Sequence, residues 1–226
     1  MRPLIIMNGE KIDWFHTVIR MLMYLAGVAV LALGMSLQTA SGLGVAAFTC
    51  FATTLSMLTG KTLGFWITAT YVAYIVAQFT ILRREFQPRI LLELCFSTLI
   101  GGFTDFFMAV NPLHPAALPI QVETMLLSLA VTAFGVSLVV NMGVVPNAPD
   151  GLVQVIAEKI KRRFGDVKVV FDCSHVAVSL VLSLALMHNL GGFGVTTAIS
   201  ALFLGHVINI ANKLFAQRFI RAAFGK

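Results

Sequence analysis

The stretch AVLALGMSL, residues 29–37, returns later in the chain as AVTAFGVSL, residues 130–138. The two copies share Ala, Val, Ala, Gly, Ser and Leu at equivalent positions, and the same register continues to Gly42 and Gly143. Because the spacing is held beyond the repeated stretch, it indicates an internal duplication of the whole chain. An internal repeat determines the overall architecture of a protein, and in membrane proteins the binding site often lies where the two repeats meet.

The composition is that of a membrane protein. The chain is 58% hydrophobic and 12% charged, whereas soluble domains carry about 25% charged residues. Six apolar windows approach the ~20 residues that span a bilayer, and they cover residues 21–38, 63–82, 90–110, 124–142, 167–187 and 195–214. We therefore expect an all-α membrane protein with six transmembrane helices and no soluble domain.

Two further apolar segments, residues 44–58 and 150–164, are too short to span. Each follows the repeated motif in its own half, so each half has the order long, short, long, long. We expect two short helices that either re-enter the membrane or lie in its interface.

Charge placement predicts the topology. Lys and Arg gather in four clusters, whereas residues 111–123 and 188–194 contain none. The clusters are Arg2, Lys11 and Arg20; Arg83, Arg84 and Arg89; Lys159, Lys161, Arg162, Arg163 and Lys168; and Lys213, Arg218, Arg221 and Lys226. All four lie in the cytoplasm if both short segments leave on the side they entered. Each half then crosses three times, and the two halves become inverted repeats.

This topology divides the chain into four parts. They are a cytoplasmic N-terminal segment (1–16), a first repeat (17–115), a second repeat (116–214) and a basic cytoplasmic tail (215–226). The expected partner is the lipid bilayer, and small-residue helix faces are compatible with a homodimer. We expect no nucleic acid, no cofactor and no metal, because the three cysteines are scattered and no folded basic face lies outside the membrane.

The turn NMGVVPNAPDG, residues 141–151, is the most informative candidate site. Its prolines and glycines interrupt the helix. Asn147 or Asp150 can cap the helix that follows, and Asp150 would also favour a cation or an amine. Its first-half counterpart contains polar residues but no charge. The expected substrate-binding residues are Gln38, Thr39, Ser41, Asn141, Asn147, Asp150 and Gln154.

Two polar helix faces form a second candidate. Asp172, His175, Ser179 and Ser183 share one face of the window 167–187, and Thr70, Tyr74 and Gln78 share the equivalent face of 63–82. Asp172 and His175 are spaced to meet and are the expected proton- or ion-coupling groups. The alternative is that Asp172 only pairs with Lys168. Lesser candidates are Glu93, Asp105, His206 and Asn209.

Several motifs carry a family resemblance. They are Gly-Leu-Gly at 42–44, PNAPDGL at 146–152, Asp172 early in the next helix, and GGFGVT at 191–196. The chain resembles the YczE/YitT-like bacterial integral membrane proteins. The resemblance implies a multi-pass protein of the bacterial inner (plasma) membrane that is often presumed to be a transporter, and the charge pattern places both termini in the cytoplasm. Many relatives have Pro-Trp-Asp where this chain has Ala46, Ala47 and Phe48, which removes an acidic role from the first half.

We therefore expect a small secondary transporter or exporter of a small polar molecule or ion, with a midplane site where the two short segments meet. The alternatives are a passive channel, a substrate-binding subunit of a partner-driven transporter, and a membrane scaffold without transport. An enzyme is not expected, since the sequence has no HExxH, no GxSxG and no pair of acidic motifs of the kind that intramembrane proteases use.

Overall fold

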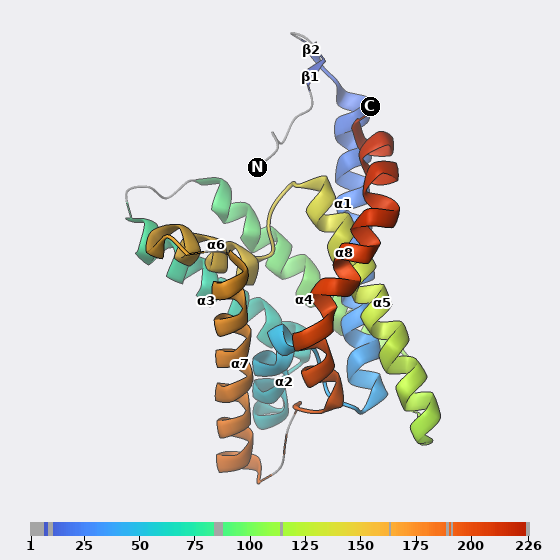
Figure 1. The fold of residues 1–226 in the computed structure, drawn as a ribbon, viewed down its shortest axis with the longest axis vertical. Coiled ribbons are helices and arrows are strands. Elements are labelled where there is room, and N and C mark those ends of the chain that lie inside the picture. Colours follow the sequence, from blue (N-terminus) through green and yellow to red (C-terminus); the bar gives the residue numbers. More distant parts are fainter. Residues whose placement is uncertain are drawn as a thin grey trace.

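The computed structural model describes residues 7–8, 11–83, 88–113, 115–162, 164–188, 190 and 192–224. Almost all of this part of the chain is helical (Figure 1). The helices are α1 (Trp14–Ser41), α2 (Ala47–Thr59), α3 (Leu63–Leu82), α4 (Leu92–Val110), α5 (Leu118–Met142), α6 (Ala148–Ile160), α7 (Phe164–Met187) and α8 (Val195–Phe224), with a 3₁₀ turn η2 (Pro88–Leu91) before α4. A short hairpin precedes α1 and was not expected; its two strands, β1 (Met7–Asn8) and β2 (Lys11–Ile12), have two residues each.

Six of the described helices are long and apolar enough to cross a membrane: α1, α3, α4, α5, α7 and α8. The remaining two, α2 and α6, have 13 residues each and are too short to span. The expected fold class, an all-α membrane protein with six long and two short helices, is confirmed.

Glycine ends the first long helix of each half at the repeated position. Gly42 follows α1 with φ +70°, and Gly143 follows α5 with φ +57°. Both lie in the left-handed region, where glycine lacks the steric cost of a Cβ. The duplication therefore preserves the point at which the chain leaves each helix and turns toward the short one.

Helices α1 and α5 form an antiparallel pair at the centre of the fold (Figure 1). A Cβ added at Gly34 would lie 2.8 Å from the backbone N of Thr132, and one at Gly135 would lie 2.6 Å from that of Leu31. When Ala29 is aligned on Ala130, Gly34 corresponds to Gly135 and Leu31 to Thr132. The two close approaches are therefore the same contact made twice, as a twofold relation between the halves requires.

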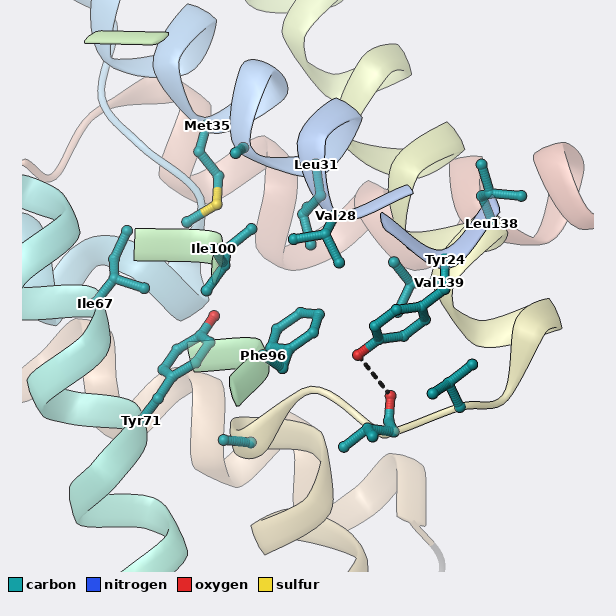
Figure 2. Close-up of a cluster of buried hydrophobic side chains, with 14 of the residues drawn as sticks. Tyr24, Val28, Leu31, Met35, Ile67, Tyr71, Phe96, Ile100, Leu138 and Val139 are labelled. Atoms are coloured by element: carbon teal, nitrogen blue, oxygen red, sulfur yellow. Dashed lines mark hydrogen bonds between the residues drawn. The ribbon is translucent and has the colours of Figure 1, made fainter. Parts of the chain in front are cut away.

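The main apolar core lies on one side of this pair (Figure 2). Val28, Leu31 and Met35 of α1 meet side chains of α3 and α4, including Ile67 and Phe96. Tyr24 closes the core near the α5–α6 connection, and its hydroxyl donates to the carbonyl of Val145 at 3.4 Å.

The short helices exchange partners between the halves. α2 packs on α7, and α6 packs on α3. Since α2 corresponds to α6 and α3 to α7, these contacts are also related by the repeat. The beginning of α1 and the end of α8 lie at one end of the molecule (Figure 1), as expected for two inverted repeats with three crossings each.

Each short helix begins inside the protein and ends at its surface. Ala46 and Ala148, at the starts of α2 and α6, are fully buried, whereas Met57 and Ile160, near their ends, are half exposed. After α1 the chain turns back into the molecule before α2 begins (Figure 1). This burial favours the re-entrant interpretation over a helix that lies wholly in the interface.

The last helix is longer than expected. α8 continues to Phe224, through most of residues 215–226 that the charge pattern assigned to a tail. Arg2, Arg84, Arg163, Gly191 and Lys226, which entered the topology or the motif argument, lie outside the described residues.

Candidate functional site

The site is built around the buried start of α6. Asn147 occupies the N-cap position without a capping side-chain bond, and Asp150 lies in the first helical turn. The non-helical segment between α5 and α6 is therefore shorter than the prolines suggested. Pro149 is accommodated in the first turn of α6, where a backbone N–H has no partner within the helix and its loss costs nothing. Asp150 is not the cap, and its carboxylate is left to other partners.

Lys168 of α7 joins two carboxylates. Its Nζ lies 3.0 Å from Oδ1 of Asp150 and 3.1 Å from Oδ1 of Asp172. The three side chains are only 21–35% exposed. A cation shared between two half-buried carboxylates links α6 to α7 and keeps both charges in the protein. The alternative that Asp172 pairs with Lys168 is thus what the structure contains.

His175 lies one turn further along α7 and has different partners from those expected. Its Nδ1 is 2.8 Å from the carbonyl oxygen of Phe171, and its Nε2 is 2.6 Å from the hydroxyl of Tyr74. Since the carbonyl can only accept, Nδ1 carries the proton, and in the neutral ring Nε2 accepts from Tyr74. No described hydrogen bond joins Asp172 to His175, because both ring nitrogens have other partners.

The bond from Tyr74 to His175 does join the two predicted polar faces of α3 and α7. Further along α7, the Ser179 hydroxyl donates to the carbonyl of His175, and Ser183 lies 3.4 Å from the hydroxyl of Thr54 on α2. The polar face of α7 therefore reaches from the start of α6 to α2.

Glu93 and Gln78 belong to the same region, and the importance of Glu93 was missed. Glu93 is 1% exposed and accepts from Nε2 of Gln78 at 2.7 Å. Gln78 also approaches the carbonyl of Ala148 at 3.4 Å. A Cβ at Gly151 would lie 2.8 Å from Oε1 of Glu93, so glycine lets the carboxylate reach the first turn of α6. From the sequence, the position of Glu93 close to Arg89 had indicated a residue at the membrane interface instead.

A cavity of about 320 Å³ opens beside this turn. Its polar lining comes from Asn147, Asp150 and Gln154, and its apolar lining from α1, α5 and the connection that follows α5. Oδ1 of Asn147 and the hydroxyl of Tyr71 are buried and have no hydrogen-bond partner among the described residues. Three of the seven predicted substrate-binding residues thus line one cavity.

The three predicted residues of the first half lie in the last turn of α1. Gln38 accepts from the N–H of Ala46 at 3.0 Å and donates to Thr132 at 3.2 Å. Thr39 and Ser41 donate to carbonyls of their own helix. The expectation that both short segments form one site is not met, because α2 packs mainly on α7 and α6 mainly on α3.

Asn141 is also separate from the cavity lining. Its Nδ2 donates to Oδ1 of Asn212 at 2.7 Å, and Ser137 donates to the same oxygen at 2.6 Å. This cluster holds α5 against α8, as polar groups between transmembrane helices commonly do.

A buried arginine was not singled out from the sequence. Arg20 of α1 is fully buried and donates to the carbonyls of Met142 and Gly143 at 2.7 and 2.9 Å. These carbonyls end α5, where a cation is favoured by the helix dipole. Gln121 stands at the equivalent repeat position and approaches Gly42.

Comparison with known proteins decides the family. The model of the family of unknown function DUF6198 matches residues 18–213. The chain belongs to this family. It is also 32% identical, over 147 residues, to an uncharacterized membrane protein YczE of Bacillus subtilis (strain 168), and the match covers 63% of this chain and 65% of that protein. The expected YczE-like resemblance is confirmed. No solved structure was found to match.

Proposed function

We propose that this multi-pass membrane protein is a small secondary transporter or exporter whose substrate is a small cation or an amine-bearing molecule. The observation that carries the proposal is the cavity beside the break between α5 and α6, where the carboxylate of Asp150 faces both the cavity and Lys168. A half-buried ionisable group at a helix break inside a duplicated membrane protein is a frequent feature of substrate sites.

The charge balance supports a cationic substrate. Asp150, Asp172 and the buried Glu93 bring three carboxylates to the first turn of α6, whereas Lys168 is the cation that the described ion pairs place there. A substrate cation could compete with Lys168 for Asp150. An anion would meet the excess of negative charge and be disfavoured.

The contacts between the α1–α2 connection and the region where α7 leads into α8 favour alternating access over an open channel. The residues after α1 bond to the α7–α8 connection and to the start of α8: Val45 N–H donates to Gly192 O at 3.0 Å, and Thr196 N–H donates to Leu43 O at 2.9 Å. A Cβ at Gly44 would lie 2.6 Å from the backbone N of Gly194. This close pairing holds the two connections together, which is compatible with a transporter closed on one side and favours it over an open channel.

The orientation belongs to the same proposal. Apart from Lys61, the described Lys and Arg residues lie near the beginning of α1, around the α3–α4 and α6–α7 connections, or in the second half of α8. The beginning of α1 and the end of α8 lie at the same end of the molecule (Figure 1). The positive-inside rule would place that end in the cytoplasm, in the plasma membrane of a bacterium.

A ligand screen in detergent tests the proposal. Wild type and the Asp150→Asn and Asp172→Asn variants would be melted with a panel of alkali cations and small amines. Binding at 100-fold over Kd stabilises by about 2.7 kcal/mol. We expect a stabilising compound whose effect is lost in Asp150→Asn and kept in Asp166→Asn, which changes an exposed carboxylate of α7. If no compound stabilises wild type, and Asp150→Asn only lowers the melting temperature, the ion cluster is structural and the scaffold alternative gains.

A further inference from the structure

We propose that α8 carries a binding site for one anionic phospholipid, with an acyl chain in an apolar groove and the phosphate at Arg218 and Arg221. The site lies on the lipid-facing side of α8 and does not depend on the proposed transport function.

The groove lies between α1, α5 and α8 and has a volume of about 380 Å³. Its lining is almost entirely apolar and includes Val30, Ala130, Phe134 and Leu214. Leu214 is 63% exposed, so the groove is open to the surrounding bilayer. The shape and the chemistry of the lining fit a hydrocarbon chain.

The helix end beyond the groove is held in place. Phe134 of α5 makes edge contacts with Phe215 and Phe219, with ring centroids 5.3 and 5.5 Å apart. Ala223 is fully buried in the main core. The residues that the sequence assigned to a tail therefore form a fixed extension of α8, and its arginines keep a constant position relative to the groove.

The arginines continue the face of α8 that lines the groove. Stepping by three or four residues from Val207 leads through Ala211 and Leu214 to Arg218 and Arg221. Both arginines are exposed, and no carboxylate among the described residues forms an ion pair with either. Lys213 is exposed on the same helix but does not line the groove.

The depth also fits. With 1.5 Å of rise per residue, Arg218 lies roughly 35 Å along the axis from Val195, beyond the ~30 Å hydrocarbon core. The groove lies in the half of the membrane next to the arginines. One lipid of that leaflet can therefore place its chain in the groove while its phosphate accepts from both guanidinium groups.

Native mass spectrometry of the full chain tests the site with phosphatidylglycerol and phosphatidylcholine. We expect wild type to bind phosphatidylglycerol at least severalfold more tightly. Arg218→Gln/Arg221→Gln should bind the two lipids equally, and Lys213→Gln should keep the preference for phosphatidylglycerol. Ala130→Leu, at an exposed position of the groove, should weaken the binding of both lipids because the larger side chain fills the space of the acyl chain. Equal binding of the two lipids by wild type, an equal loss in Lys213→Gln, or unchanged binding in Ala130→Leu would each overturn the proposal.

Discussion

Gly34 and Thr132 bring the two halves of the chain into backbone contact, and Gly135 and Leu31 repeat this contact at the related position. The reciprocity follows from the duplicated sequence, since a twofold contact uses the same two positions in both directions. Helix packing in membranes depends on such small residues, because lipid offers no hydrophobic drive for helices to associate.

Adding a methyl group at either glycine should separate α1 from α5. We predict that Gly34→Ala and Gly135→Ala each destabilise the protein by about 1–3 kcal/mol, the usual cost of overpacking. Gly102→Ala is the matched control, because a Cβ there meets no atom within 4 Å. Melting temperatures in detergent check the prediction, and an equal effect of all three substitutions would contradict the close contact.

Lys168 should be needed for stability because it holds two carboxylates. Lys168→Met leaves Asp150 and Asp172 facing each other without their cation, and we predict a loss of roughly 2 kcal/mol. Adding Asp150→Asn and Asp172→Asn to Lys168→Met should restore most of the loss, because no half-buried charge is then left unpaired. Urea or thermal unfolding of the single and combined variants measures the coupling. Additive losses would show that the three groups do not act together.

The hydrogen bond from Tyr74 to His175 should stabilise the contact between α3 and α7. We predict that Tyr74→Phe costs about 0.5–1.5 kcal/mol. Tyr24→Phe removes a longer bond of 3.4 Å to a carbonyl and should cost less. Thermal unfolding of both variants gives the comparison, and a larger effect at Tyr24 would contradict the described geometry.

Replacing Arg20 even by lysine should lower the stability of the protein. Lys cannot donate from two fixed nitrogens to the carbonyls of Met142 and Gly143. We predict that Arg20→Lys loses about 1.5–3 kcal/mol, the value of one charged hydrogen bond, and that Arg20→Met loses more. Protease resistance of the turn between α5 and α6 provides a local readout. Full stability of Arg20→Lys would show that one donor is sufficient.

Asp13 should make the start of α1 sensitive to acid. The N–H of His16 donates to its carboxylate at 3.1 Å, which lowers the pKa of Asp13 below its ordinary value of 3.8. A lowered pKa adds stability above the unfolded value and loses it as the pH falls through the folded one. We predict that the protection of the His16 amide, measured relative to its intrinsic exchange rate at each pH, falls below about pH 4. Asp13→Ala, which removes the capping oxygen, should reduce the protection of this amide at neutral pH as well.

The sequence predicted the six long helices, the two short helices and the relation between the halves. Long apolar windows identify membrane-spanning helices, and loops without lysine or arginine identify the outer side of the membrane. Both signals come from short stretches of sequence and do not depend on tertiary contacts. The extension of α8 was missed, because Arg218 and Arg221 indicated a tail while the contacts of Phe219 that hold the helix are made to α5.

The site was predicted in part. Asn147, Asp150 and Gln154 come together because they lie within two turns of one segment. Gln38 does not join them, since the partner of each short helix is decided by packing between the halves. The pairing of Glu93 with Gln78 was missed for the same reason: only the fold brings the beginning of α4 to the end of α3 and the first turn of α6.

The most direct test of the account is charge movement in proteoliposomes. Wild type, Asp150→Asn and Asp166→Asn would be reconstituted and challenged with alkali cations and small amines on a solid-supported membrane. We predict a saturable transient current in wild type and in Asp166→Asn that is abolished in Asp150→Asn. No current from any compound in wild type, or an undiminished current in Asp150→Asn, would contradict transport through the cavity beside α6.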